Sequence, residues 1–197
     1  MTQKRIIGLT GGIATGKTTV SDYLAEAYQL TVLDADVYAR ETVQPGSLVL
    51  DRIVERYGND ILGGDRTLNR RRLGEVVFAN PAERQWLEQQ IHPVVRSRFQ
   101  AEMDNIAAST VVLAIPLLFE AKLTHLVTEI WVVYCEPTQQ LERIIKRDRL
   151  TPEHAHARIS SQFPLADKVA AADVVLDNAS TPEHLLQQVD AALAREM

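Results

Sequence analysis

Cysteine is almost absent from this chain of 197 residues, and its scarcity excludes several kinds of site. The single cysteine, Cys135, can form neither an intrachain disulfide nor a zinc site built from several thiolates. It directly follows the apolar residues 131–134. Because free cysteine is usually buried, we expect Cys135 to be a packing residue at the end of a strand.

The sequence also lacks a positive net charge and any long apolar run. It has 26 acidic and 21 basic residues and a net charge of −5, which argues against a general nucleic-acid or anionic-membrane surface. No stretch is long enough to span a membrane. Residues 1–5 lead at once into an apolar run and leave no room for a signal peptide. We therefore expect a cytoplasmic protein, monomeric or a weak homo-oligomer, without nucleic-acid or membrane partners.

The strongest signal is the stretch Gly-Gly-Ile-Ala-Thr-Gly-Lys-Thr at residues 11–18, which we call the phosphate loop. It fits the pattern G-x-x-x-x-G-K-[ST] at every fixed position. A short apolar strand is expected before it and a helix over residues 17–28 after it, and this context separates a true site from a chance match. The alternative, a glycine-rich turn with an exposed lysine, does not account for that context. The stretch predicts a nucleoside triphosphate site.

The residue types of the phosphate loop suit this chemistry. Glycines let backbone N–H groups turn toward phosphate oxygens, and the helix N-terminus adds a partial positive charge. Lys17 is expected to reach the β- and γ-phosphates, and Thr18 to offer its hydroxyl to Mg²⁺. The residues expected to contact the nucleotide are Gly11, Gly12, Ile13, Ala14, Thr15, Gly16, Lys17, Thr18 and Thr19.

The rest of the chain alternates strands with helices. Apolar segments predict five strands, at residues 4–10, 31–33, 110–115, 129–135 and 173–176. Helices are expected after them, including those that begin near Pro137, Thr151 and Thr181. Strands that are apolar along their whole length indicate a parallel sheet covered on both faces, and so a three-layer α/β sandwich.

Residues 45–107 interrupt this alternation. They predict helices beginning near Pro45, over residues 69–78, and from Asn80 to about residue 105, with Pro93 as a kink site. So much helix between two strands exceeds a crossover connection, so we interpret it as an inserted helical subdomain. The expected division within a single domain is a core of residues 1–44, 108–142 and 172–197, an insert of 45–107 and a lid of 143–171.

Two aspartates after the second predicted strand, Asp34 and Asp36, help to choose among three classes of phosphate-loop protein. A GTPase should carry Asn-Lys-x-Asp, which is missing, and a motor or partitioning ATPase should have an acid closing an apolar strand. The third strand ends in Ile115-Pro116 instead. A carboxylate such as Asp36 suits a small-molecule kinase, in which it accepts the proton of the attacking hydroxyl. The alternative is that both acids cap a helix or are solvated.

Arginines after the fourth predicted strand fit a kinase as well. Arg143 and Arg147 lie four apart on one helical face, and Arg158 follows in the next helix. Arginines on a closing lid can neutralise the charge on the transferred phosphoryl group and exclude water. The alternative is a solvated basic face that pairs with Glu142 and Asp148.

Two further side chains have open interpretations. Asn178, just past the fifth predicted strand, is expected either to flank the nucleotide base or to be a turn residue. His92, before Pro93, is either a packing histidine at the kink or a contact to the phosphate acceptor.

An ordered set of short motifs spans almost the whole chain. It consists of Gly8-Leu9-Thr10-Gly11-Gly12-Ile13 with the phosphate loop, Asp34-Ala35-Asp36 with Ala39-Arg40, Leu68-Asn69-Arg70 with Leu73 and Val77-Phe78, Ile91-His92-Pro93, Pro116-Leu117-Leu118-Phe119-Glu120, Arg147-Asp148, Arg158-Ile159 with Gln162, Ala172-Asp173, and Asp177-Asn178. In this set the chain resembles the dephospho-CoA kinase family, which completes coenzyme A synthesis. Asp-Ala-Asp, His-Pro and Pro-Leu-Leu-Phe-Glu are its most specific parts. Ala14-Thr15 and Thr18 differ from the Gly-Ser and Ser common in that family, but they keep the loop chemistry.

The resemblance implies transfer of the ATP γ-phosphate, with Mg²⁺, to the ribose 3′-hydroxyl of dephospho-CoA. It implies a P-loop kinase core with a five-stranded parallel sheet, a helical CoA-binding subdomain and a lid. Asp36 matches the family's base, Lys17 and Arg147 match its phosphate-binding positions, and Asn178 is expected beside the nucleotide. The residues implied to contact the acceptor are Asp36, Arg40, Arg70, Phe78, His92, Leu117 and Arg158.

A local basic cluster of Arg40, Arg70 and Arg96 could hold an anionic acceptor on an otherwise acidic protein. Two alternatives remain at this point. One is a kinase of another small hydroxyl acceptor, such as a nucleoside or nucleotide. The other is an ATP-dependent binding switch that hydrolyses slowly.

Overall fold

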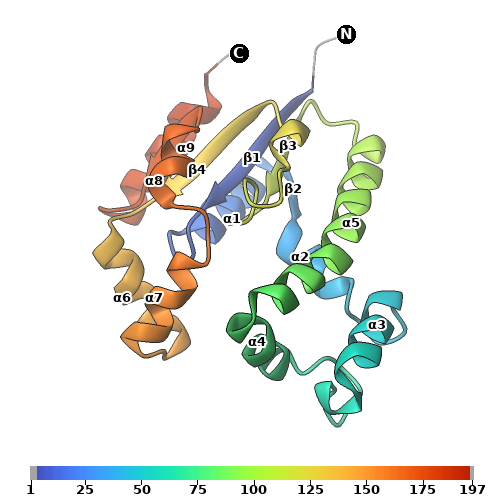
Figure 1. The fold of residues 1–197 in the computed structure, drawn as a ribbon. Helices are drawn as coiled ribbons and strands as arrows, with labels where there is room; N and C mark the ends of the chain where they lie inside the picture. The colour runs from blue at the N-terminus through green and yellow to red at the C-terminus, as the bar shows by residue number, and fades with distance from the viewer. Residues whose placement is uncertain (1–3, 196–197) are drawn as a thin grey trace. The chain divides into compact units, whose positions relative to one another are not determined.

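The computed structural model describes residues 4–195, and the side chains of Phe78 and Ala79 lie outside the described part. Within it, five strands form one parallel sheet in the order β2-β3-β1-β4-β5 (Figure 1). The strands are β1 (Arg5–Gly11), β2 (Thr31–Asp34), β3 (Thr110–Ala114), β4 (Glu129–Tyr134) and β5 (Val174–Asp177). The structure confirms the predicted five-stranded parallel sheet.

The chain divides into two compact units, one of Met1–Asp34 with Ala107–Met197 and one of Ala35–Ile106. The first, the sheet unit, carries the sheet and the helices α1 (Lys17–Tyr28), α6 (Pro137–Asp148), α7 (Pro152–Ser160), α8 (Leu165–Ala170) and α9 (Pro182–Leu193), with the short 3₁₀ turn η2 (Thr124–Leu126). The second, the helical unit, carries α2 (Ala35–Glu41), α3 (Leu48–Tyr57), α4 (Arg70–Ala79) and α5 (Pro81–Asn105), with the 3₁₀ turn η1 (Asn59–Ile61).

The core of the sheet unit lies between the sheet and two helices. Ile7 and Leu9 of β1 and Trp131 of β4 are fully buried, and they share one hydrophobic cluster with Leu24 of α1 and Leu185 of α9. Burial of each such side chain contributes about 1.5–3 kcal/mol. Helices α1 and α9 therefore cover one face of the sheet and fix the start of α1 beside the end of β1.

Cys135, directly after β4, is fully buried, as predicted for a packing residue. Burial raises the pKa of its thiol above the ordinary value, with Arg143 acting in the opposite direction. Because the thiolate is the nucleophilic form, this environment keeps the sulfur unreactive near neutral pH.

The helical unit has its own apolar core and well-defined helix caps. Its buried cluster consists of Val43, Val49, Ile53, Ile61, Leu73 and Val77. The Asn80 side chain accepts from the Ala82 amide and Pro81 occupies the first turn of α5, as predicted. The helix expected near Pro45 begins at Leu48, because the Ser47 side chain caps it. Helix α5 continues through Pro93, which removes one intrahelical hydrogen bond.

Among the helices of the described residues, none is both long and apolar enough to cross a membrane.

Candidate active site

The phosphate loop connects β1 to α1 and lies at the carboxyl ends of the parallel strands. Gly16 is the N-cap of α1 and no side chain caps that helix end. The first amides of a helix have no acceptor within the helix, so those of Lys17, Thr18 and Thr19 can donate to an anion. The loop therefore offers a set of backbone donors of the kind that binds phosphate.

Close neighbours explain the loop's three glycines. A Cβ on Gly16, whose φ is +108°, would lie 2.3 Å from Asn178 Nδ2. A Cβ on Gly12 would lie 2.4 Å from Gln140 Nε2, and one on Gly11 would lie 2.7 Å from the Val133 carbonyl oxygen. Three different segments thus approach the loop so closely that side chains there would displace them.

Asn178 follows β5 and contacts the loop backbone directly. Its Nδ2 donates to the Thr15 carbonyl oxygen at 2.8 Å. The Thr15 hydroxyl in turn donates to the Gly12 carbonyl oxygen at 2.9 Å. The structure therefore brings the predicted Asn178 to the phosphate loop, where it orders the backbone.

A carboxylate lies beside the loop lysine. Lys17 Nζ is 3.6 Å from Asp34 Oδ2, and the two side chains are 12% and 28% exposed. Asp34 is the last residue of β2, so the strand delivers this carboxylate to the loop. Asp36 is the second residue of the helical unit, in the first turn of α2. Among the described residues, no group of three or more His, Cys, Asp or Glu side chains is placed to hold a metal ion.

The arginines of α6 and α7 meet on one aspartate. Asp148 accepts from Arg147 Nε at 2.8 Å, from Arg147 Nη2 at 3.1 Å and from Arg158 Nη1 at 2.9 Å. These hydrogen bonds, chiefly those of Arg147, hold the pKa of the Asp148 carboxyl below its usual value. Arg143 instead donates to the Asn178 carbonyl oxygen at 2.9 Å. Pairing with Asp148 is expected if these arginines form a solvated basic face. Their phosphate-binding role stays a prediction.

Comparison with known proteins identifies the family. The family model for dephospho-CoA kinase matches residues 5–183. The chain is 57% identical to the dephospho-CoA kinase of Trichormus variabilis over 197 residues, which is 100% of both chains. The chain belongs to the dephospho-CoA kinase family. The resemblance in the sequence motifs is thereby confirmed.

Solved structures agree with membership of the dephospho-CoA kinase family. The dephospho-CoA kinase of Campylobacter jejuni is 27% identical, with a TM-score of 0.69 over 97% of this chain and 96% of that one. The crystal structure of TT1252 from Thermus thermophilus is 32% identical, with a TM-score of 0.79 over 98% and 97% of the two chains. The α/β class predicted from the sequence is confirmed, with a kinase fold.

Several residues expected to contact the acceptor in a dephospho-CoA kinase lie in the helical unit. Arg70 Nη2 donates to the Arg40 carbonyl oxygen at 3.3 Å, and burial, followed by the charge of Arg40, lowers the pKa of Arg70. His92 is partly buried, and burial lowers its pKa below the ordinary value. The predicted Phe78 side chain lies outside the described residues. Leu117 belongs to the sheet unit, in the turn after β3.

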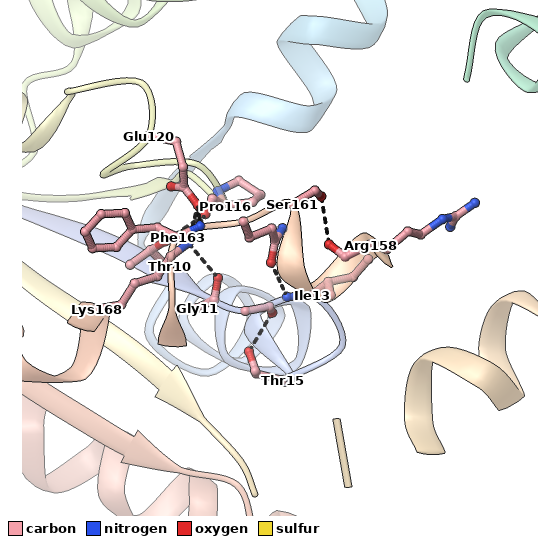
Figure 2. A network of polar contacts seen from close by, with 12 residues as sticks. Thr10, Gly11, Ile13, Thr15, Pro116, Glu120, Arg158, Ser161, Phe163 and Lys168 are labelled. Carbon is pink, nitrogen blue, oxygen red and sulfur yellow. Dashed lines mark hydrogen bonds and ion pairs between the residues drawn. The ribbon is translucent and has the colours of Figure 1, made fainter. Parts of the chain in front are cut away.

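Sequence reasoning missed a buried lysine that contacts the phosphate loop in this member of the dephospho-CoA kinase family. Lys168 of α8 is fully buried, and its Nζ lies 2.9 Å from Glu120 Oε1, 3.1 Å from the Pro116 carbonyl oxygen and 3.5 Å from the Gly11 carbonyl oxygen (Figure 2). Glu120 closes a motif noted in the sequence, but Lys168 on a short helix reads as an ordinary surface lysine. Only the packing of α8 against the sheet identifies it.

We expect Lys168→Met to lower the free energy of unfolding by about 3 kcal/mol or more. The substitution keeps the length of the side chain, but it leaves Glu120 without the Lys168 ammonium and removes one donor each from the Pro116 and Gly11 carbonyl oxygens. Urea titration at neutral pH measures the change. The double variant K168M/E120Q should recover part of the loss because the orphaned charge is gone. A single variant as stable as the wild type would contradict this account.

Proposed function

We propose that this protein transfers the γ-phosphoryl group of ATP to the 3′-hydroxyl of the ribose of dephospho-CoA, giving CoA and ADP, the last step of coenzyme A biosynthesis. The observation that carries the proposal is the full-length similarity to relatives named dephospho-CoA kinase. The phosphate loop accounts for the nucleotide half of the reaction. Both proposed substrates are metabolites of the cytoplasm, where we place the protein as a monomer or weak homo-oligomer.

ATP is proposed to bind with its phosphates at the start of α1. The amides of Gly16 to Thr19 would donate to phosphate oxygens, and Lys17 would exchange Asp34 for the β- and γ-phosphates. Asn178 supports this arrangement through the Thr15 carbonyl. Mg²⁺, when bound, neutralises phosphate charge; Thr18, exposed in the first turn of α1, is the residue proposed to hold it.

Asp36 is the proposed general base. It lies two positions after Asp34, whose carboxylate is beside Lys17, so chain connectivity keeps its Cα within about 7 Å of that of Asp34. The 3′-oxygen of the ribose forms a bond to the γ-phosphorus as the bond to the β–γ bridging oxygen breaks. The hydroxyl proton passes to the Asp36 carboxylate, and ADP leaves.

The proposed lid, residues 143–171, supplies positive charge. Arg147 and Arg158 share Asp148, and the equatorial oxygens of a transferring phosphoryl group would compete with that carboxylate for the two guanidinium groups. Arg147 is the one expected to act in the transition state. Closure of the lid would also exclude water, which would otherwise hydrolyse ATP.

The helical unit is the proposed acceptor site. Arg40 and Arg70 are linked by a hydrogen bond, and with Arg96 they would supply the charge for an anionic acceptor. His92 is partly buried and its pKa is lowered, so its neutral form is favoured for contact with the acceptor. Phe78 and Leu117 are the proposed apolar contacts.

An assay of ADP release tests the function. Purified protein is supplied with ATP, Mg²⁺ and dephospho-CoA, adenosine or no acceptor, and CoA is identified in the products by mass spectrometry. We expect ADP release only with dephospho-CoA, with one CoA formed per ADP. Preference for adenosine would indicate a kinase of another acceptor. Equal ADP release without any acceptor would indicate an ATP-dependent switch.

A further inference from the structure

Ile13, in the middle of the phosphate loop, is held from both sides by glutamine side chains. Its N–H donates to Gln162 Oε1 at 2.8 Å, and its carbonyl oxygen accepts from Gln140 Nε2 at 2.9 Å. The glutamines come from separate segments, since Gln140 lies on α6 and Gln162 lies in the turn between α7 and α8. Both backbone polar groups of one loop residue are thus satisfied by side chains rather than by secondary structure.

The backbone just after Ile13 needs such support. Ala14 has a φ of +62° and Gly16 a φ of +108°, both in the left-handed region. A non-glycine residue there costs of order 1–3 kcal/mol and persists only where its surroundings hold it. The two glutamines fix the residue before Ala14, and Asn178 fixes the carbonyl of the residue after it.

Gln162 is itself presented by an ordered turn. The Phe163 amide donates to Glu120 Oε1 at 2.8 Å, and the same oxygen pairs with the buried Lys168 (Figure 2). The Phe163 ring stacks on Phe119, with centroids 5.9 Å apart. The turn carrying Gln162 is therefore held against the segment that follows β3. β3 pairs with β1, the strand that leads into the phosphate loop.

Gln140 has an equally defined place. It is 4% exposed on α6, and its Nε2 lies 2.4 Å from the position that a Cβ on Gly12 would take. The loop can approach α6 this closely only because residue 12 is glycine. The neighbouring Gln139 makes a bond of the same kind, from Nε2 to the Ala179 carbonyl oxygen at 2.9 Å, but outside the loop.

From this geometry we infer that Gln140 and Gln162 are positioning residues for ATP. By fixing Ile13 they hold the strained Ala14 and keep the following amides directed at the phosphates before the nucleotide arrives. The inference rests on the proposed use of ATP and extends it. Gln162 joins the phosphate loop to the proposed lid, and Gln140 joins it to α6, the helix that leads into the lid. Loss of either glutamine should then weaken nucleotide binding without affecting the acceptor.

The test uses Gln140→Met and Gln162→Met, which keep the side-chain length and remove the hydrogen bonds, with Gln139→Met as the matched control. Affinity for a non-hydrolysable ATP analogue is measured by isothermal titration calorimetry, well below each variant's Tm. We expect about tenfold weaker binding for Q140M and for Q162M, and a change within about twofold for Q139M. Because both glutamines act through Ile13, the double variant should lose less than the product of the two single losses.

Steady-state kinetics add a readout that a merely structural role would not move. The KM for ATP should rise in Q140M and Q162M, while the KM for dephospho-CoA and kcat at saturating ATP stay within about twofold. Analogue affinities within twofold of wild type in both variants, or an equal loss in Q139M, would overturn the inference. Wild-type protein that binds no analogue would instead refute the proposed function, a result that does not depend on any variant.

Discussion

Replacing Lys17 by alanine is expected to weaken ATP binding and to reduce turnover by about a hundredfold to a thousandfold, the usual effect of removing one preorganised donor aimed at charge that develops in the transition state. The Lys17 ammonium lies 3.6 Å from Asp34, so it has a counter-ion before the nucleotide binds. In K17A the phosphates would lose their cation and would also meet the negative charge of Asp34, which Lys17 offsets in the wild type. Both ground-state binding and transition-state stabilisation should therefore fall.

Calorimetry with an ATP analogue and steady-state kinetics with dephospho-CoA measure the two losses separately. Lys4→Ala is the control, because Lys4 immediately precedes β1, at the end of that strand away from the loop. It should leave ATP affinity within about twofold. If K17A bound the analogue as tightly as wild type, the phosphate loop would be wrongly interpreted.

Asp36→Asn is expected to leave ATP binding intact and to lower kcat by at least about a hundredfold. A positioned general base typically contributes about 10²–10⁴ in rate, and an amide cannot accept the proton of the ribose hydroxyl. Since Asp36 is proposed to contact only the acceptor hydroxyl, the affinity for nucleotide should not change. Single-turnover kinetics at saturating substrates isolate the chemical step from product release.

The neighbouring aspartate makes this experiment selective. Asp34→Asn removes the partner of Lys17 but keeps Asp36, so it should alter the KM for ATP more than kcat. Asp22→Asn, at an exposed position on α1, controls for the loss of one negative charge. If D34N rather than D36N abolished the chemical step, the base would be the residue at the end of β2.

Local patterns predicted much of the fold because local physics determines those features. Apolar runs defined the five strands, and Thr151 and Thr181 each cap a helix by accepting from the amide three residues on, as expected for Thr followed by Pro. The phosphate loop was recognisable because its backbone path requires glycine at set positions.

The remaining features depend on which segments the fold brings together. Gln140 and Lys168 look like surface residues in the sequence, yet the first is 4% and the second 0% exposed. Gln140 donates to the Ile13 carbonyl oxygen and Lys168 to that of Gly11, so both contact the phosphate loop. Sequence reasoning assigned the catalytic role to Asp36, which stays a prediction, but did not foresee that Asp34 lies beside Lys17. That contact depends on where β2 ends and α2 begins, and residue patterns define such boundaries least well.

The position of β1 in the sheet has a consequence for biosynthesis. β1 pairs with β3 on one side, where Arg5 faces Thr110, and with β4 on the other, where Gly11 faces Val133. Both partners leave the ribosome long after the first strand, whereas Ala35–Ile106 form their compact unit from one uninterrupted segment. We therefore expect the helical unit to fold first during synthesis. The phosphate loop should reach its final structure only after translation has passed β5, because Asn178 contacts the loop and distant pairings are slow to close.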